Sequence, residues 1–129
     1  MKRGGILHAE LAGALARLGH TDLVVIADCG LPRPRGVQVI DLAVTLGVPG
    51  FADVLRAVAA EIVVEAAEVA TETATANPAA QALVTSLFGE PGSLSHEELK
   101  ARSAGAVLLV RTGEATPYAN VLLRCGVPF

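Results

Sequence analysis

Two short segments of the chain carry side chains suited to proton transfer and to the binding of polar ligands. The first segment places His20 and Asp28 at the two ends of a short apolar run, Leu23-Val24-Val25-Ile26-Ala27. The second places Tyr118 and Asn120 close together in a segment rich in turn-forming residues. Imidazole transfers protons near neutral pH, and carboxylate, carboxamide and phenol groups form hydrogen bonds with hydroxyls. Together these four side chains could hold a small polyhydroxylated molecule and move its protons.

Each residue of the first segment also has a purely structural interpretation. His20 follows Gly19 at a helix-to-strand junction, where a histidine could act in proton transfer or could hydrogen-bond to the local backbone. Asp28 follows the apolar run, where its carboxylate could accept hydrogen bonds from sugar hydroxyls. The same carboxylate could instead close an Asx-turn into Gly30-Leu31-Pro32. The residues alone leave both alternatives open.

The C-terminal half of the chain offers two further pairs. If residues 118–120 are extended, Tyr118 and Asn120 point to the same side and suit a polar ligand; the alternative is a tyrosine that anchors a loop beside a turn asparagine. Ser95-His96-Glu97-Glu98 fits a capping box with Ser95 as the N-cap, which places His96 in the first turn of a helix. Lys100 lies four residues on, on the same helical face. The alternative for His96 and Lys100 is a solvated surface helix.

Hydrophobic periodicity and turn residues predict the elements that must position these side chains. Helical spacing and capping signals predict helices, and short apolar runs predict strands. The predicted helices cover 7–18, 52–60, 78–88 and 96–102, and the predicted strands cover 22–27, 37–44, 106–110 and 121–125. Residues 61–74 are ambiguous between helix and strand, and we favour a strand centred near 62–70. This alternation predicts an α/β fold, and the length predicts a single domain over residues 1–129.

The composition excludes several classes of partner and site. The net charge is -3 and no block of Lys and Arg is present, which argues against nucleic acid as a partner. No run approaches the ~20 apolar residues of a membrane span, and no signal-type segment opens the chain, so we expect a cytoplasmic protein without membrane contact. Cys29 and Cys125 form no CxxC pair, and the histidines and cysteines lack zinc-type spacing. We therefore predict no disulfide framework, no metal site and no cofactor.

Two weaker signals have a structural interpretation. His8 falls off the apolar stripe of the first predicted helix, which predicts a solvated helix residue. Glu61, Glu65, Glu68 and Glu72 recur at spacings of four and three, which favours a solvated face over an acid–base pair.

Taken in their order along the chain, these residues resemble the ribose pyranase/fucose mutarotase family over nearly the whole length. The match is densest at Gly19-His20-Thr21-Asp22, Asp28-Cys29-Gly30-Leu31-Pro32, Asp41-Leu42-Ala43, Gly47-Val48-Pro49, Val64-Glu65-Ala66-Ala67, His96-Glu97, Gly113-Glu114, Pro117-Tyr118-Ala119-Asn120 and Gly126-Val127. The resemblance implies a three-layer α/β/α domain with a mixed sheet. It also implies assembly of copies into a pentameric ring and a stacked decamer, with sites at subunit boundaries.

The resemblance further implies an activity and a set of site residues. The activity is interconversion of the β-pyranose and β-furanose forms of D-ribose, by a cytoplasmic enzyme that prepares ribose for phosphorylation. The family's proton donor matches His20, and Lys100 matches a further sugar contact. The sugar-binding positions match Asp28, His96, Tyr118, Ala119 and Asn120.

Two departures from the family pattern bear on these expectations. The segment between Phe88 and Ser95 is shorter than in familiar members, which suggests that a peripheral strand or loop is missing. Cys29 replaces a more usual small residue beside Asp28. The histidine that fucose mutarotases carry shortly after this aspartate is absent, so the ribose enzymes are the closer relatives. The alternatives are a mutarotase for fucose or another monosaccharide, a non-catalytic sugar-binding module, and a structural ring-forming protein.

Overall fold

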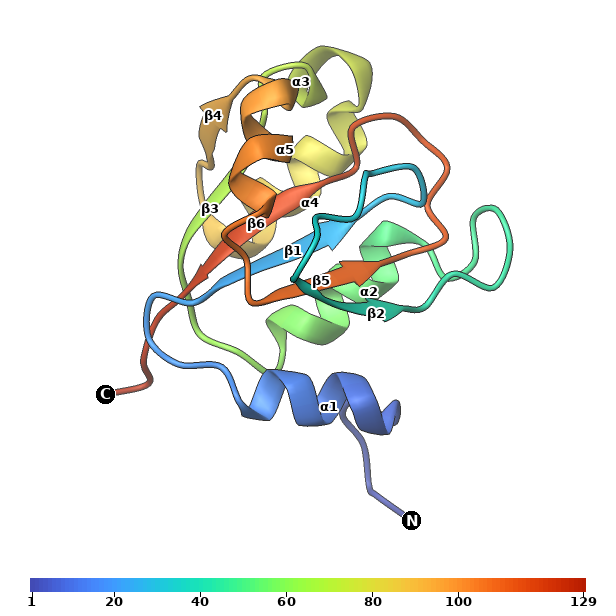
Figure 1. The fold of residues 1–129 in the computed structure, drawn as a ribbon, viewed down its shortest axis with the longest axis vertical. Coiled ribbons are helices and arrows are strands. Elements are labelled where there is room, and N and C mark those ends of the chain that lie inside the picture. Colours follow the sequence, from blue (N-terminus) through green and yellow to red (C-terminus); the bar gives the residue numbers. More distant parts are fainter.

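The computed structural model describes all 129 residues, and its helices and strands alternate along most of the chain (Figure 1). The helices are α1 (Ala9–Ala16), α2 (Phe51–Ala59), α3 (Thr73–Ala76), α4 (Pro78–Phe88) and α5 (His96–Ser103). The strands are β1 (Leu23–Ala27), β2 (Gln38–Asp41), β3 (Val64–Ala70), β4 (Gly92–Leu94), β5 (Leu108–Arg111) and β6 (Val121–Cys125). No helix combines the length and the hydrophobicity needed to cross a bilayer.

The six strands form one mixed sheet in the order β2-β5-β1-β6-β3-β4. Strand β6 is antiparallel to both of its neighbours, β1 and β3, whereas every other pair of neighbours is parallel. In Figure 1 the arrow of β6 accordingly points the opposite way to those of β1 and β5. Five strands therefore end, and β6 begins, at the same end of the sheet, which we call the carboxyl end. At the other end, the amino end, β1 begins and β6 stops.

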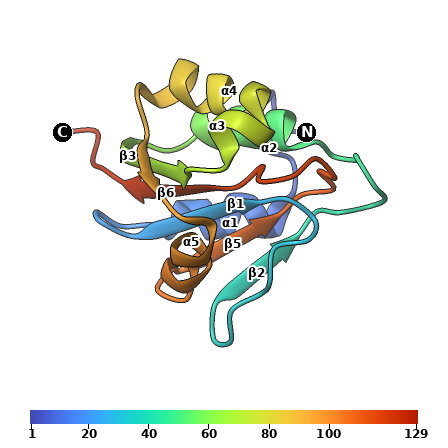
Figure 2. The same ribbon diagram turned by 90° about the horizontal axis from the view of Figure 1, so that it is seen from above.

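Alternate residues of the strands face two different layers of helices. In β1, Val24 and Ile26 pack in the larger core with residues of α1, α2 and α4, whereas Val25 and Ala27 face Leu99 of α5. Among the buried residues of the larger core, only Phe51 is aromatic, and aliphatic side chains fill most of the space. Figure 2 shows the sheet edge-on from above, with β6 between β3 and β1. The predicted three-layer α/β/α architecture with a mixed sheet is confirmed.

Local hydrogen bonds explain where the observed elements differ from the predicted ones. The first helix begins only at Ala9, because Nδ1 of His8 accepts the Leu11 amide proton at 3.2 Å and caps the helix. His8 is exposed, as predicted, but it lies at the N-cap and not within the helix. Strand β2 stops at Asp41, whose Oδ1 accepts the Ala43 amide proton at 3.1 Å.

Residues 61–74 contain β3 and the beginning of α3, so the strand prediction is confirmed there. The four glutamates consequently do not share a helical face. Glu61 lies in a turn, Glu65 and Glu68 lie in β3, and Glu72 is the N-cap residue of α3. None of the four glutamates is buried, but they do not form the single solvated face that was predicted, because the strand, the turns and α3 take these carboxylates to different places.

The shortened segment between Phe88 and Ser95 still contains a peripheral strand. Gly92–Leu94 form β4, which is parallel to β3 in the register Val69 to Ser93. The Thr71 amide also donates to the Leu94 carbonyl at 2.8 Å. The expectation that a peripheral strand is missing is therefore wrong.

Candidate active site

Asp28 and Asn120 meet at the carboxyl end of the sheet, where β1 ends and β6 begins. The Asp28 amide donates to Oδ1 of Asn120 at 2.9 Å, and Nδ2 of Asn120 donates to Oδ2 of Asp28 at 2.8 Å. The Gly30 amide donates to Oδ1 of Asp28 at 2.9 Å, so the Asx-turn is present as well. Asn120 is buried and Asp28 is half-buried. Each Asp28 oxygen keeps acceptor capacity for a hydroxyl, so the turn and a binding role are compatible.

His96 and Tyr118 form a second pair at the same end of the sheet. Their ring centroids lie 5.1 Å apart, and the rings are nearly perpendicular at 84°. The His96 amide donates to the Glu72 carboxylate at 3.0 Å, which fixes the first residue of α5. His96 is half-buried, and its Nδ1 atom is buried without a hydrogen-bond partner. A solvated surface histidine is therefore ruled out.

Tyr118 reaches His96 from a tight turn and not from an extended segment. Its φ of 56° lies in the left-handed region, which is uncommon for residues other than glycine. Oγ1 of Thr73 donates to the Tyr118 carbonyl at 3.1 Å and holds this turn. Residues 118–120 are therefore not extended, and the prediction that Tyr118 and Asn120 point to the same side does not apply. Tyr118 pairs with His96, whereas Asn120 pairs with Asp28.

Lys100 and Ala119 are placed differently from the two pairs. The predicted capping box is present at the start of α5, where Ser95 and Glu98 bond reciprocally. Nζ of Lys100 forms an ion pair with Glu97 at 2.5 Å and makes no hydrogen bond to the other candidates. Ala119 is buried, and its methyl group packs in the larger core.

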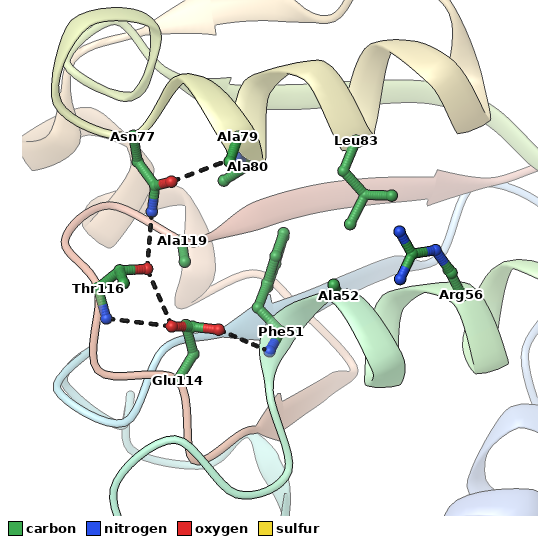
Figure 3. A pocket seen from close by; sticks show the side chains of 10 residues that line it. All are labelled: Phe51, Ala52, Arg56, Asn77, Ala79, Ala80, Leu83, Glu114, Thr116 and Ala119. Carbon is green, nitrogen blue, oxygen red and sulfur yellow. Dashed lines mark hydrogen bonds between the residues drawn. The ribbon is translucent and has the colours of Figure 1, made fainter.

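A network that the sequence did not reveal holds the loop before Tyr118 between the starts of α2 and α4. Figure 3 shows it along a cavity of about 310 Å³. Oε2 of Glu114 accepts the Phe51 amide proton at 3.0 Å, and its Oε1 accepts the hydroxyl proton of Thr116 at 2.9 Å. Nδ2 of Asn77 donates to Oγ1 of Thr116 at 2.9 Å and to the Pro117 carbonyl at 2.8 Å. Glu114, Thr116 and Asn77 thus form one connected hydrogen-bond network, and its effect is to position the loop.

Three carboxylates next to the candidate residues have lowered pKa values. The pKa of Glu72 is lowered by a hydrogen bond from its own backbone amide and by one from the amide of His96, which together outweigh burial. Burial raises the pKa of Glu114, but hydrogen bonds from the amide of Phe51 and from Thr116 outweigh burial, and the pKa falls below its ordinary value. At Asp41 burial likewise raises the pKa, and hydrogen bonds from the Ala43 amide and from Arg111 outweigh it. Asp41 and Arg111 form an ion pair, and Nε of Arg111 also donates to the Cys29 carbonyl at 3.0 Å. Together these contacts fix the loop that follows Asp28.

At Gly113 the loop that follows β5 crosses closely over residues 45–49, the segment before α2. A Cβ atom on Gly113 would lie 2.3 Å from the Val48 carbonyl oxygen and 2.7 Å from that of Thr45. The Gly113 amide donates to the Pro49 carbonyl at 2.8 Å. Only glycine permits this close approach of two backbone segments.

His20 lies at the amino end of the sheet, away from the other candidates. Its side chain is 53% exposed, and Nε2 lies 3.0 Å from Oε2 of Glu65. The five residues of β1 and its flanking turns separate His20 from Asp28 by about 20 Å, since a strand rises ~3.3 Å per residue. One chain therefore carries two separate groups of candidates, with His20 at one end and the polar pairs at the other.

Comparisons with known proteins show the family of the chain. The chain matches the model of the RbsD/FucU transport protein family over residues 1–128. The chain belongs to this family. It is 60% identical to D-ribose pyranase 1 of Rubrobacter xylanophilus and 57% identical to D-ribose pyranase of Streptomyces coelicolor, and each match covers 100% of both chains. The predicted family resemblance is confirmed.

Solved structures of the family share the fold. The structure of Bacillus subtilis RbsD complexed with D-ribose matches with a TM-score of 0.94 and 46% identity, and the match covers 100% of both chains. FucU from Bifidobacterium longum matches with a TM-score of 0.83 at 23% identity, over 95% of this chain and 97% of that one. The second likeness shows the common fold alone.

No three histidine, cysteine, aspartate or glutamate side chains are grouped so that they could hold a metal ion. Both cysteines are free thiols, and Cys125 is buried at the end of β6. Burial raises the pKa of the Cys125 thiol, and the nearby carboxylates of Asp22 and Glu65 raise it further.

Proposed function

We propose that this chain is a D-ribose pyranase, an isomerase that interconverts the β-pyranose and β-furanose forms of D-ribose. The observation that carries the proposal is the pairing of Asp28 with Asn120 and of His96 with Tyr118 at one end of the sheet. These groups occur in a chain 46% identical, over its whole length, to RbsD solved with D-ribose. Its relatives at 60% and 57% identity carry the name D-ribose pyranase.

The reaction has two steps, each of which needs two proton transfers, and involves no change of oxidation state. In ring opening, the bond between C1 and the ring oxygen breaks, and its electron pair stays on the oxygen, which takes up a proton. The anomeric hydroxyl gives up its proton, and C1 becomes an aldehyde carbon. In reclosure, the C4 hydroxyl oxygen bonds to C1 and loses its proton, while the carbonyl oxygen gains one. General acid–base catalysis by side chains is sufficient for both steps.

We propose that His20 donates the proton to the ring oxygen, because its imidazole is exposed to an incoming ligand. Asp28 and Asn120 would orient hydroxyls through the free acceptor and donor capacity of a pair that is already fixed. His96 and Tyr118 would add a hydrogen-bonding imidazole and phenol beside them. We propose Lys100 and the backbone of Ala119 as further contacts of the sugar.

The site is complete only when a second copy of the chain supplies His20. The support for this step is the separation of about 20 Å between His20 and Asp28 along β1, which one ribose molecule does not span. We therefore propose that the amino end of one subunit faces the carboxyl end of the next, in the pentameric ring and stacked decamer that the family resemblance implies. We further propose that this assembly works in the cytoplasm, supplying ribose in the form that is phosphorylated.

The direct test is NMR exchange spectroscopy of D-ribose with and without the protein. We expect faster exchange between pyranose and furanose signals when the protein is present. A panel containing L-fucose and other monosaccharides separates the alternatives. Acceleration for fucose and not for ribose would indicate a mutarotase of that sugar, and saturable ribose binding without acceleration would indicate a sugar-binding module. Absence of both binding and acceleration would leave only a structural role.

A further inference from the structure

The side chain of His20 is held by a carboxylate that is itself held by an arginine. Oε2 of Glu65 lies 3.0 Å from Nε2 of His20, and Oε1 of the same carboxylate forms an ion pair with Arg124, whose Nε lies 2.8 Å away. These three residues come from the turn before β1, from β3 and from β6. Nδ1 of His20 makes no hydrogen bond within the chain. Of the two ring nitrogens, Nε2 is therefore engaged and Nδ1 is free.

The backbone of β3 is built to present Glu65 at this place. Against β6, Val64 is paired with Cys125 but Ala66 is paired with Arg124, so Glu65 is the extra residue of a β-bulge. Bulges re-aim a side chain and are common beside active sites. A Cβ on Gly126 would lie 3.3 Å from Cβ of Glu65 and 3.1 Å from the Val63 side chain, so a side chain there would crowd the bulge.

The turn that carries His20 is held in an unfavourable backbone conformation. Thr21 has a φ of 69°, and a β-branched residue is strained in this left-handed region. The Thr21 amide donates to the Cys125 carbonyl at 2.9 Å, and Oδ2 of Asp22 accepts the Gly19 amide proton at 2.8 Å. These bonds fix the turn against the end of β6. The position of the imidazole is thus determined from two sides, by its backbone and by Glu65.

We propose that Glu65 is a positioning residue for His20, and that Nδ1 is the nitrogen that delivers the proton to the sugar. The proposal rests on the proposed function. In the imidazolium form both nitrogens carry protons; Glu65 accepts the hydrogen bond from Nε2 and remains ionised. The Nδ1 proton passes to the ring oxygen as the bond from C1 to that oxygen breaks. The neutral imidazole left behind is the Nε2–H tautomer, which the same hydrogen bond stabilises.

The first test measures the tautomer of His20 in the sugar-free protein by ¹⁵N NMR, with signals assigned through variants of the three histidines. We expect neutral His20 to be the Nε2–H tautomer alone, and a mixture of tautomers in Glu65→Ala. Observation of the Nδ1–H tautomer in the unaltered protein, or of no difference between the two proteins, would overturn the proposal. Because no sugar is present, this result does not depend on the proposed activity.

The second test is a double-mutant cycle on the exchange rate. Glu65→Gln should lower the turnover number about tenfold or more, but less than the ~10²–10⁴-fold that loss of a general acid costs, with the ribose dissociation constant within about twofold. Combined with His20→Ala it should add no further loss, because Glu65 acts only through the imidazole. Additive losses, or a loss confined to ribose affinity, would contradict this role.

The matched control is Glu68→Gln, which makes the same substitution in the same strand. The Glu68 carboxylate forms its ion pair with Arg102 of α5 and not with a histidine, so we expect unchanged turnover. If Glu65→Gln does not assemble, as judged by circular dichroism and gel filtration, Arg124→Met tests the same contact by releasing the carboxylate. We expect a smaller fall in turnover from that variant, and unchanged turnover would count against the proposal. Absence of exchange in the unaltered protein would reject the proposed function, and the tautomer measurement would still decide the role of Glu65.

Discussion

The hydrogen bonds of His20 differ from those of the residues proposed to hold the sugar. Asn120 is buried and uses both its carbonyl oxygen and its amide group on Asp28. His20 is half-exposed and uses one nitrogen on Glu65. Loss of the first residue should disturb binding and local structure, whereas loss of the second should leave structure intact and slow the chemistry.

We expect His20→Ala to lower the exchange rate of ribose by ~10²–10⁴-fold, the usual contribution of a general acid, while ribose still binds. Saturation-difference NMR measures the rate, and calorimetric titration measures the binding. His8→Asn is the control, because it removes another surface imidazole and asparagine remains a good helix N-cap. An unchanged exchange rate in His20→Ala would remove His20 from the mechanism.

We expect Asn120→Ala to weaken ribose binding by about tenfold or more and to lower the free energy of unfolding by ~1–3 kcal/mol, because it leaves the Asp28 amide without a partner. Denaturant unfolding and calorimetric titration measure the two effects. Val84→Ala, which removes methyl groups from the core beneath α4, loses stability without touching the site and separates the two effects. A dissociation constant equal to that of the unaltered protein would exclude Asn120 from binding.

At the level of the elements, the loop between β5 and β6 owes its position to the helices it touches. Glu114 caps the start of α2, which has no side-chain cap of its own at Gly50. Asn77 caps α4 and also holds the Pro117 carbonyl. The turn that aims Tyr118 therefore depends on the relative placement of two helices that are distant from it in the sequence.

The lowered pKa of Glu114 gives a pH dependence of known sign. A carboxyl group whose pKa is lower in the folded than in the unfolded chain contributes its full stability above its unfolded value, 4.5, and loses it as the pH falls through the folded value. We expect Glu114→Gln to lower the free energy of unfolding by about 1–2 kcal/mol at neutral pH. The difference from the unaltered protein should shrink below pH ~4.5.

Urea unfolding between pH 3 and pH 7 measures this dependence. Glu90→Gln is the control, because Glu90 is exposed and forms no hydrogen bond or ion pair through its side chain. We expect no pH-dependent difference for that variant. A constant difference for Glu114→Gln across the whole range would contradict the assigned role of the ionised carboxylate.

For the whole molecule, the proposed assembly makes activity depend on contacts between copies of the chain, because His20 and Asn120 lie at opposite ends of the sheet. In a heterologous ring the two ends of the sheet come from different copies at each boundary. We expect His20→Ala and Asn120→Ala, each nearly inactive alone, to recover activity when co-expressed. With random mixing, about a quarter of the boundaries combine an intact His20 with an intact Asn120.

The control mixture combines Asp28→Ala with Asn120→Ala. Both residues lie at the carboxyl end of the same chain, so no boundary in this mixture has an intact carboxyl end, and no recovery is expected. Recovery in the control, or its absence in the first mixture, would show that the two groups of residues do not meet across a boundary.

Features that depend on neighbouring residues could be predicted from the sequence. The capping box at Ser95, the cap and proline at the start of α4 and the buried strand 22–27 were all predicted, because capping and apolar alternation act over a few residues. Features that depend on distant contacts were not. The turn at Tyr118 is held by Thr73, and the role of Glu65 depends on a bulge against β6.

The sequence by itself determined the family, the α/β class and the set of polar residues that could bind and protonate a sugar. Only the tertiary structure decided which of them act together. Strand β6 lies antiparallel between β1 and β3, so Asn120 at its start meets Asp28, and Arg124 near its end meets the partner of His20. Such pairing follows from hydrogen bonds and burial across the sheet, which join residues far apart in the sequence and leave no local signal.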